Sequence, residues 1–366
     1  MSRGETWRYF DFWLFGVVVI LSIFGVAMIQ SAIAGNIDLA EHVNRQIVFL
    51  IIALAMMLVV SAVDYRYWLS FTRPFYYITM VFLIIVFLTS QARFGAARWI
   101  EAGLVNIQPA ELAKIVIILT LAEYFSKNKD APKNLVWVIR SLSLVFFIVI
   151  WILLQPNLST SIVLFVLWFA MIWIAGLPIR YVVIFGLIAI VIFAVAFPFL
   201  ENYQQQRILT FLFPDPNARY GNTYNVEQAL ITIGSGGLFG MGYGHGSQVQ
   251  LRFLKVRHTD FIFAAMAEEF GFIGTVIVVG LLLFVVFRCF RAARLAADLF
   301  GSLVSYGFGF LIFFQMAVNI GVNLKVIPVT GLTLPFISYG GSSLVSLAIG
   351  IGLVQSVLLR QKSLNF

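Results

Sequence analysis

Long apolar runs separated by short polar segments make up most of the chain. A helix that crosses a bilayer needs about 20 mostly apolar residues. Ten runs approach or exceed that length, with approximate bounds 12–32, 46–63, 75–90, 109–125, 136–154, 158–175, 179–200, 260–287, 300–321 and 337–359. Only Gln155, Pro156 and Asn157 separate the fifth run from the sixth, which predicts a tight helical hairpin. The pattern predicts an all-α, polytopic membrane protein with about ten transmembrane helices in a single domain, residues 1–366.

One segment between the seventh and eighth runs is too long and too polar to be a turn. Within this loop, residues 201–259, the stretch 226–233 fits a short amphipathic helix, and seven glycines follow between positions 234 and 246. Glycine-rich backbone makes either tight turns or a cradle of N–H groups for an anion. Tight turns that fold the loop back onto the membrane surface are the simpler interpretation. A nucleotide site is not predicted, because the Walker A pattern and a preceding strand are both missing.

The composition excludes several classes of soluble protein. The chain is 61% hydrophobic and 11% charged, whereas a soluble domain carries about 25% charged residues. A secreted enzyme, a nucleic-acid-binding domain and a disordered scaffold are therefore excluded, and the net charge of +8 does not indicate a nucleic-acid partner. The single cysteine, Cys289, cannot form an internal disulfide. The first apolar run is longer than the core of a signal peptide, so we expect it to remain as a helix.

The distribution of lysine and arginine predicts the orientation. Cytoplasmic loops near helix ends carry an excess of these residues. With the N-terminus inside, the inner segments hold 14 of the 24 basic residues and the short outer loops hold four. We therefore expect a multi-pass protein with both termini in the cytoplasm and with the loop 201–259 on the extracytoplasmic side.

Charged residues within apolar runs are the first candidates for function, because a charge in the bilayer is costly without a partner or a polar cavity. Glu111 and Lys114 are three residues apart and so share a helix face. They either form an internal ion pair that locks two helices or line a polar cavity that opens outward. Glu268 and Glu269 cannot face lipid cheaply, and we expect them to be buried in protein.

Asp260 follows Arg257, His258 and Thr259 where the long loop enters the eighth run. An aspartate there could cap the helix, a role worth about 1 kcal/mol, or it could act as a general base. The helix N-terminus and Arg257 would lower its pKa, whereas burial would raise it. His258 could be an interfacial hydrogen-bonding residue or a proton carrier. The histidines show no spacing typical of metal ligands.

Several motifs, taken in order along nearly the whole chain, resemble the signatures of the SEDS family of cell-wall polymerases (RodA, FtsW and SpoVE). They are Arg98–Ile100, Gln108–Lys114, Gln206–Arg207, Gly234–Gly237, Phe253–Ala264 with Ala267–Glu269, Asn319–Gly321 and Leu334–Ser342. The loop before the eighth run is most similar to that of the RodA branch.

The resemblance implies a peptidoglycan glycosyltransferase that polymerises lipid II on the outer side of the bacterial cytoplasmic membrane. Asp260 falls on the family's essential aspartate, which favours catalysis over capping. The implied substrate-binding residues are Arg98, Trp99, Glu111, Lys114, Arg207, Arg257 and His258. The family further implies a class B penicillin-binding protein as transpeptidase partner, against the eighth and ninth helices and the long loop. The RodA likeness favours a role in cell elongation and shape, while the sequence alone leaves division and sporulation open.

The implied reaction inverts an anomeric centre, which needs a base for the acceptor hydroxyl and positive charge for the departing pyrophosphate. No organic cofactor is required, and no residue is assigned as a metal ligand. A divalent cation such as Mg²⁺ or Mn²⁺ could assist at the pyrophosphate, although Asn157 stands where the family usually has an aspartate. A transporter for lipid II or another amphiphile, and a non-catalytic scaffold, are the alternatives. No inverted repeat with paired broken helices supports transport.

Overall fold

The computed structural model describes residues 9–34, 39, 41–91, 100–102, 105–199, 202–213, 221–254 and 256–361. The helices that match apolar runs are α2 (Phe12–Ile33), α3 (Glu41–Ala62), α4 (Tyr65–Gln91), α5 (Pro109–Lys127), α6 (Leu135–Leu154), α7 (Leu158–Ile174), α8 (Ile179–Ala196), α12 (Ile262–Leu295), α13 (Leu299–Asn323) and α14 (Gly341–Leu359). The long loop contains α9 (Asn202–Leu212), α10 (Gly221–Ser235) and α11 (Ser247–Gln250). A 3₁₀ turn, Phe197–Phe199, follows α8.

The helical prediction is confirmed, since each of the ten predicted runs coincides with a helix. Seven helices in the described part of the chain are long and apolar enough to cross a membrane, and α7 and α8 are shorter apolar helices. The predicted hairpin joins α6 to α7. Two bounds differ most from the prediction: α4 begins at Tyr65 rather than near residue 75 and continues through Pro74, and α12 ends at Leu295 rather than near residue 287. A small antiparallel hairpin, β1 (Ile100–Ala102) with β2 (Val105–Ile107), was not predicted.

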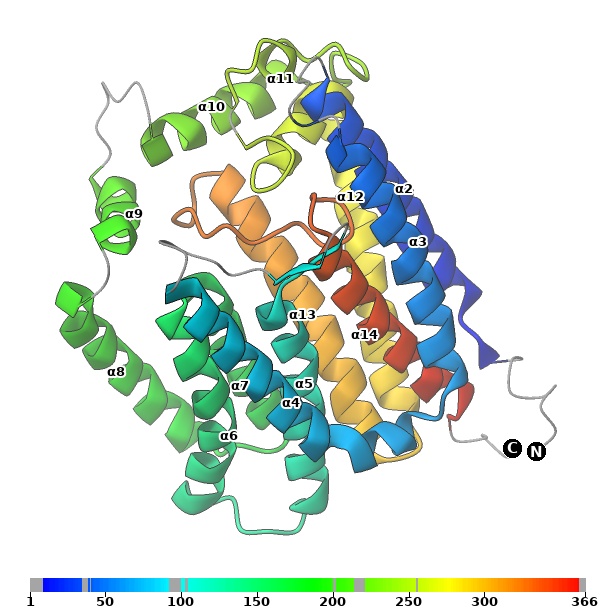
Figure 1. Ribbon diagram of the computed structural model, residues 1–366, viewed down its shortest axis with the longest axis vertical. Coiled ribbons are helices and arrows are strands. Elements are labelled where there is room, and N and C mark those ends of the chain that lie inside the picture. The colour runs from blue at the N-terminus through cyan, green and yellow to red at the C-terminus, as the bar shows by residue number, and fades with distance from the viewer. Residues whose placement is uncertain are drawn as a thin grey trace.

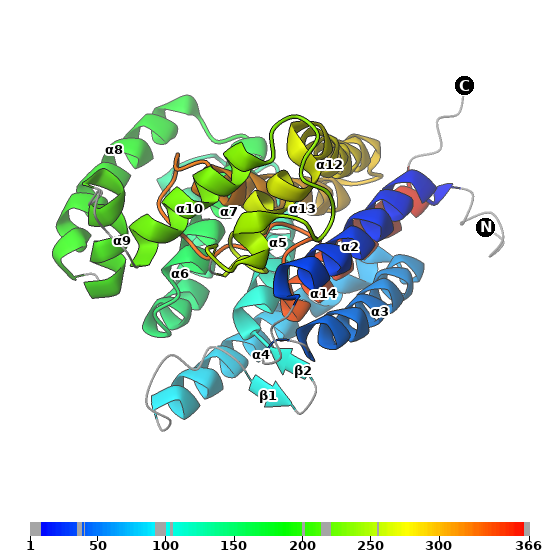
Figure 2. The same cartoon turned by 90° about the horizontal axis from the view of Figure 1, so that it is seen from above.

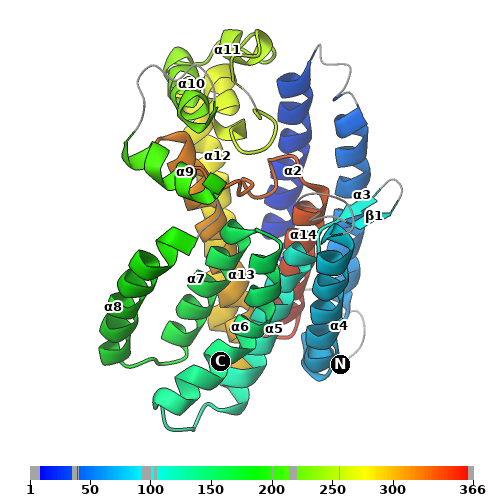
Figure 3. The same cartoon turned by 60° about the vertical axis from the view of Figure 1, so that its left-hand side comes forward.

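The helices form a bundle with the loop segments gathered at one end (Figure 1). Helices α12, α13 and α14 lie centrally, with α2 and α3 on one side and α4 to α7 on the other. Helix α8 stands at the edge of the bundle (Figure 3). Helices α10 and α11 lie over the ends of the central helices (Figure 2). The start of α2 and the end of α14 lie together at the opposite end, as expected if both termini face the same side of the membrane.

Close packing of small residues holds the centre together. A Cβ atom on Gly352 of α14 would lie 2.7 Å from the Met57 carbonyl oxygen of α3, so only glycine permits this approach. Small residues serve this purpose in membranes because lipid removes the hydrophobic drive between helices.

A buried polar cluster joins three helices at the end of the bundle opposite α9 to α11. The Asp11 N–H donates to the Gln355 side-chain oxygen (3.0 Å), and the Gln355 amide donates back to the Asp11 carbonyl (2.8 Å). The Asp11 carboxylate also pairs with Arg288 of α12 and caps α2 at Leu14. The start of α2 is therefore fixed to α12 and α14.

Helix α12 is broken at Gly271, and the glycine-rich part of the long loop completes the break. Gly271 has φ 66° and ψ −170°, a conformation that is essentially restricted to glycine. The freed carbonyls of Glu268 and Glu269 accept from the N–H groups of residues 241 and 242, each at 2.9 Å. The freed N–H groups of residues 272 and 273 donate to the carbonyls of residues 237 and 238, at 2.9 and 3.1 Å. The predicted tight turns therefore pack against the broken helix.

We predict that Gly271→Ala destabilises the protein by at least about 1–3 kcal/mol, because the conformation disfavours any side chain. A Cβ atom there would also lie 2.3 Å from the Gly240 nitrogen. Thermal unfolding in detergent measures the effect. Gly280→Ala on the same helix is the matched control, since its Cβ would meet nothing within 4 Å. Equal unfolding temperatures for the two variants would contradict the account of the break.

Candidate active site

Asp260 lies just before α12, and its side chain does not cap that helix. The N-cap residue is Phe261, which makes no side-chain cap bond. The alternative of a capping aspartate is therefore wrong for the observed geometry. Contacts from distant parts of the chain hold the backbone of Asp260, and its carboxylate accepts a hydrogen bond from the neighbouring Thr259.

Two asparagines on α13 fix the backbone carbonyl of Asp260. It accepts from the side-chain amides of Asn319 (3.1 Å) and Asn323 (3.0 Å), which are one helical turn apart and buried. The Asn319 amide also donates to the Leu332 carbonyl (2.8 Å), and the Asn323 side-chain oxygen accepts from the Ala264 N–H (3.1 Å). The pair thus joins α13, the start of α12 and the segment that follows α13.

The two residues before Asp260 are held by the segment that leads into α14. The Tyr339 N–H donates to the His258 carbonyl (2.9 Å), and the Ser338 hydroxyl donates to the Thr259 carbonyl (2.8 Å). Three consecutive carbonyls, 258 to 260, are therefore engaged by distant parts of the chain, which fixes the direction of the Asp260 side chain.

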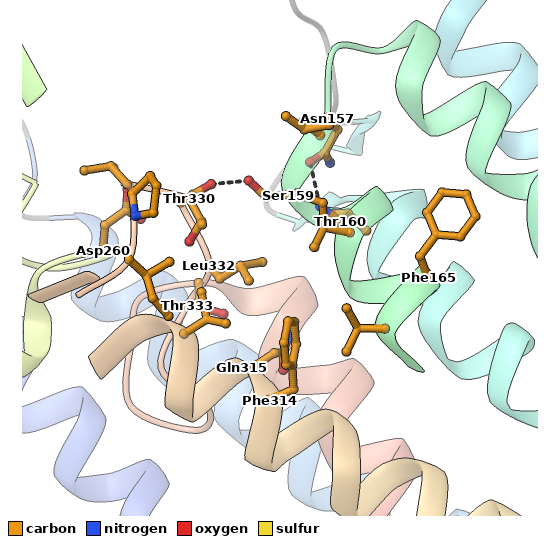
Figure 4. Close-up of a pocket in the computed structure, with 18 of the residues that line it drawn as sticks. Asn157, Ser159, Thr160, Phe165, Asp260, Phe314, Gln315, Thr330, Leu332 and Thr333 are labelled. Atoms are coloured by element: carbon orange, nitrogen blue, oxygen red, sulfur yellow. Dashed lines mark hydrogen bonds between the residues drawn. The ribbon is translucent and has the colours of Figure 1, made fainter. Parts of the chain in front are cut away.

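Asp260 borders a cavity of about 1990 Å³ that runs between the helices (Figure 4). The polar part of its wall comes from many elements: His42, Arg45, Gln108, Glu111, Asn157, Ser159, Thr160, Arg207, His258, Thr259, Asp260, Gln315, Thr330, Thr333 and Ser343. The rest of the wall is mostly apolar and is supplied by α6, α7, α8 and α9, with side chains such as Ile139, Phe165, Phe185 and Phe211. One cavity thus combines a polar region at Asp260 with a long apolar region.

Arg207 approaches Asp260 from α9 in the long loop. Its Nη1 donates to the Thr330 carbonyl (3.4 Å), which also accepts from the Ser159 hydroxyl of α7. Thr330 therefore links α7, α9 and the segment after α13 at the edge of the cavity, with Asp260 and Ser159 on either side (Figure 4).

Burial raises the pKa of the Asp260 carboxyl, while the Arg207 guanidinium and a hydrogen bond from Thr259 oppose that rise. We expected Arg257 to be the cation that acts on Asp260, and this was wrong. Arg257 is buried and donates to the carbonyls of Ala32 and Leu254. Its proximity in sequence does not bring it into the cavity wall, so it serves to hold the loop against α2.

His258 lies beside two other rings at the cavity. Its ring centroid is 5.8 Å from that of His42 and 5.9 Å from that of Tyr339. Burial lowers the pKa of His258 to about 4, with the nearby His42 and Arg257 acting in the same direction. The imidazole is therefore neutral near pH 7 and does not supply positive charge to the cavity.

Glu111 and Lys114 form the predicted ion pair, with Lys114 Nζ 2.6 Å from Glu111 Oε2. The pair lies within α5, so it does not itself lock two helices; Glu111 contacts α14 by accepting from Ser346 (3.3 Å), and it also lines the cavity. Lys114 is 1% exposed and lies behind the wall. Glu111 therefore presents to the cavity a carboxylate whose charge is neutralised by Lys114.

Glu268 and Glu269 are buried as expected, but away from the cavity. The Glu268 carboxylate accepts from the N–H groups of Gln248 (2.8 Å) and Val249 (3.1 Å) in α11. Glu269 accepts from Ser31 of α2. Both carboxylates anchor the long loop.

Some site residues fall outside the described part of the chain, and others were missed. Arg98 and Trp99 lie among the residues that the structure does not describe. His42, Arg45 and Gln315 border the cavity, although nothing in their local sequence distinguished them. Only the folding of α3 and α13 around the cavity brings these residues to Asp260.

The residues around Asp260 do not resemble a metal site. Within the described ranges, no group of three or more His, Cys, Asp or Glu side chains is placed to hold a metal ion. The other polar groups of the cavity wall near Asp260 are mainly arginine and neutral oxygens or amides. We therefore assign no step to a metal.

Comparison with known proteins identifies relatives over nearly the whole chain. A family model for FtsW, RodA and SpoVE, described as "Cell cycle protein", matches residues 6–363. The Escherichia coli K12 protein named peptidoglycan glycosyltransferase MrdB is 34% identical over 351 residues, 95% of this chain and 93% of that protein. A Thiomicrospira cyclica protein named probable peptidoglycan glycosyltransferase FtsW is 37% identical over 366 residues, 96% of this chain and 93% of that protein.

Solved structures share the fold. A chain from work described as "Structural coordination of polymerization and crosslinking by a peptidoglycan synthase complex" aligns with a TM-score of 0.81 and 30% identity, covering 97% of this chain and 99% of that one. The rod shape determining protein RodA of Thermus thermophilus aligns with a TM-score of 0.71 and 31% identity, covering 97% and 98%.

We predict that Arg207→Gln raises the pKa of Asp260 further, because a guanidinium that stabilises the carboxylate is removed. Infrared titration of the protonated carboxyl band, assigned by its loss in Asp260→Asn, measures the pKa. Arg45→Gln is the control: Arg45 lines the same cavity but is not among the groups that shift Asp260. An unchanged or lower pKa in Arg207→Gln would contradict the assignment.

Proposed function

The chain belongs to the FtsW/RodA/SpoVE (SEDS) family and is a peptidoglycan glycosyltransferase, and we propose that it polymerises lipid II with Asp260 as the general base. The observation that carries this proposal is the composition of a single cavity. Asp260 and Arg207 line the same cavity as the apolar side chains of α6, α7, α8 and α9.

Lipid II joins a polyprenyl chain to a disaccharide through a pyrophosphate, and each part has a counterpart in the cavity. The apolar region between α6, α7, α8 and α9 suits the polyprenyl chain. Arg207 and Arg45 suit the pyrophosphate, because guanidinium groups match phosphate oxygens in charge and geometry. Asp260 would then lie beside the reacting sugar.

In the proposed reaction, the Asp260 carboxylate takes the proton of the acceptor's 4-hydroxyl. That oxygen attacks the anomeric carbon of the donor sugar from the face opposite the pyrophosphate. The C–O bond to the pyrophosphate breaks, and the leaving group carries away the electron pair. The α-linked donor thus becomes a β-1,4 linkage, and Arg207 stabilises the charge on the departing pyrophosphate.

The pKa of Asp260 suits this role. A base must be ionised before it reacts, and a raised pKa makes the ionised carboxylate a stronger base. Activity should therefore fall as the pH falls through the pKa of Asp260. A pyrophosphate bound to Arg207 would weaken the guanidinium's pull on the carboxylate and raise its basicity when the substrate is in place.

The place of this activity in the cell is also part of the proposal. We propose that the loop 201–259 faces outward from a bacterial cytoplasmic membrane and that both termini are cytoplasmic. A class B penicillin-binding protein is the expected partner, against α12, α13 and this loop. The related complex is described as coordinating polymerization and crosslinking, which supports such a partner. Relatives with both RodA-type and FtsW-type names match, so the role in elongation rests on the likeness of the loop.

We predict that Asp260→Asn lowers the rate of glycan formation from purified lipid II by about 10²- to 10⁴-fold, the usual worth of a general base. Its unfolding temperature should be equal or higher, because no cap is lost and a buried charge is removed. Asp298→Asn, at the N-terminus of α13 and outside the cavity wall, is the matched control and should stay within threefold of the parent. If Asp260→Asn also stays within threefold, Asp260 is not the base. If the parent makes no glycan, the substrate is wrong.

The orientation predicts which introduced cysteines a membrane-impermeant thiol reagent reaches. His245→Cys lies in the long loop and Lys129→Cys lies between α5 and α6, at opposite ends of the bundle, and both positions are exposed. Intact cells should label the first and not the second. The native Cys289 is buried, so it contributes little background. Labelling of Lys129→Cys in intact cells would reverse the orientation.

A further inference from the structure

Gln315, on α13, is a buried amide that borders the cavity without a hydrogen bond. Its side chain is 1% exposed, and its Oε1 atom has no partner among the described residues. An unpaired buried polar group destabilises a folded protein, so a group of this kind needs an explanation. Thr330 Oγ1, on the same cavity wall, is a second buried oxygen without a partner in the described structure.

The fold places Gln315 close to the reacting centre. It lies four residues before Asn319, hence about 6 Å along the axis and on the same face. Asn319 holds the Asp260 carbonyl. Gly307 of α13 faces Ile118 of α5, and the two helices run in opposite directions. Gln315 lies eight residues after Gly307, about 12 Å along α13, and Glu111 lies a similar distance before Ile118 on α5. Gln315 and Glu111 are therefore at the same level of the bundle. Figure 4 shows Gln315 and Phe314 on α13, with Leu332 and Thr333 on the segment that follows this helix.

The chemistry of the amide restricts what it can bind. The unpaired Oε1 requires a hydrogen-bond donor, which neither an ionised pyrophosphate nor a polyprenyl chain offers. Glu111, at the same level, is already compensated by Lys114 and Ser346. The remaining parts of the substrate are its neutral sugar and peptide groups, of which an acetamido group offers both a donor and an acceptor to a primary amide.

Resting on the proposed function, we propose that Gln315 binds the acetamido group of the sugar that carries the pyrophosphate. The Gln315 oxygen accepts from the acetamido N–H, and the Gln315 NH₂ group donates to the acetamido carbonyl. In peptidoglycan this group is attached to C2, next to the anomeric carbon. Gln315 therefore fixes the donor sugar beside Asp260 and selects 2-acetamido sugars.

The test combines one protein change with one substrate change. Gln315→Met keeps the length of the side chain and removes its hydrogen bonds. The substrate analogue carries a hydroxyl in place of the acetamido group on the pyrophosphate-bearing sugar. Each change alone should lower kcat/KM by about 10- to 100-fold, the worth of a lost buried hydrogen bond. Together they should lower it no further than either alone, because they remove the same contact.

Ser305→Ala is the matched control. Ser305 is also buried on α13 with an unpartnered hydroxyl in the described structure, but it lies outside the cavity wall. It should keep the parent's preference for the acetamido substrate. Gln315→Met should unfold at an equal or higher temperature, since it replaces an unpaired amide with an apolar group. A lower unfolding temperature would indicate a structural role and would overturn the proposal.

Binding separates this inference from the proposed function. Dissociation constants of lipid II and of the analogue are measured for the parent, Gln315→Met and the amide-retaining Gln315→Asn. Absent polymerisation by the parent counts against the proposed function, whereas the binding preference tests Gln315 without turnover. If the parent does not distinguish the two ligands, or if Gln315→Met distinguishes them as strongly as the parent, Gln315 does not read the acetamido group.

Discussion

The segment that carries Asp260 obtains its backbone hydrogen bonds from distant parts of the chain, and the geometry of the cavity follows from this requirement. Carbonyls 258 to 260 are engaged by Tyr339, Ser338 and the Asn319–Asn323 pair. The break in α12 at Gly271 is completed by the glycine-rich turns. Where water is scarce, each unsatisfied backbone group costs several kcal/mol, so these partners are obligatory. Because the partners of these carbonyls hold the backbone in place, the Asp260 side chain is left at the wall of the cavity.

Hydrophobic runs predicted the helices because the need to bury about 20 apolar residues acts locally. The same local logic singled out the Glu111–Lys114 pair and Asp260, but it left Asp260 open between a helix cap and a general base, and only the family resemblance favoured catalysis. It failed for Arg257, since adjacency in sequence does not determine which way a side chain points. His42 and Gln315 could not be found from the sequence, because they become site residues only when α3 and α13 pack around one cavity. The sequence did not predict that α4 continues through Pro74, because proline removes one backbone hydrogen bond of the helix and the folded protein tolerates that loss.

The distribution of charge in the cavity is restricted. Lys114 is compensated by Glu111, and burial keeps His258 neutral near pH 7. Positive charge in the described wall is left mainly to Arg45 and Arg207. In a region of low dielectric constant, a few fixed guanidinium groups interact strongly with a charged ligand. Because the other cationic groups are neutral or paired, this interaction is concentrated at the place where the leaving group would form. Arg207 also lowers the pKa of Asp260 and so makes it a weaker base.

The buried cluster around Asp11, at the end of the bundle opposite α9 to α11, affects how the molecule is made. Asp11 is bonded to Gln355, 344 residues later in the chain, and to Arg288. During synthesis the first helix therefore enters the membrane long before its final neighbours exist: Asp11 lacks Arg288 until α12 has been made and lacks Gln355 until α14 has been made. A nascent or prematurely terminated chain would expose an unpaired carboxylate at the edge of its first helix. Insertion of the last helix therefore completes the hydrogen bonding of the first.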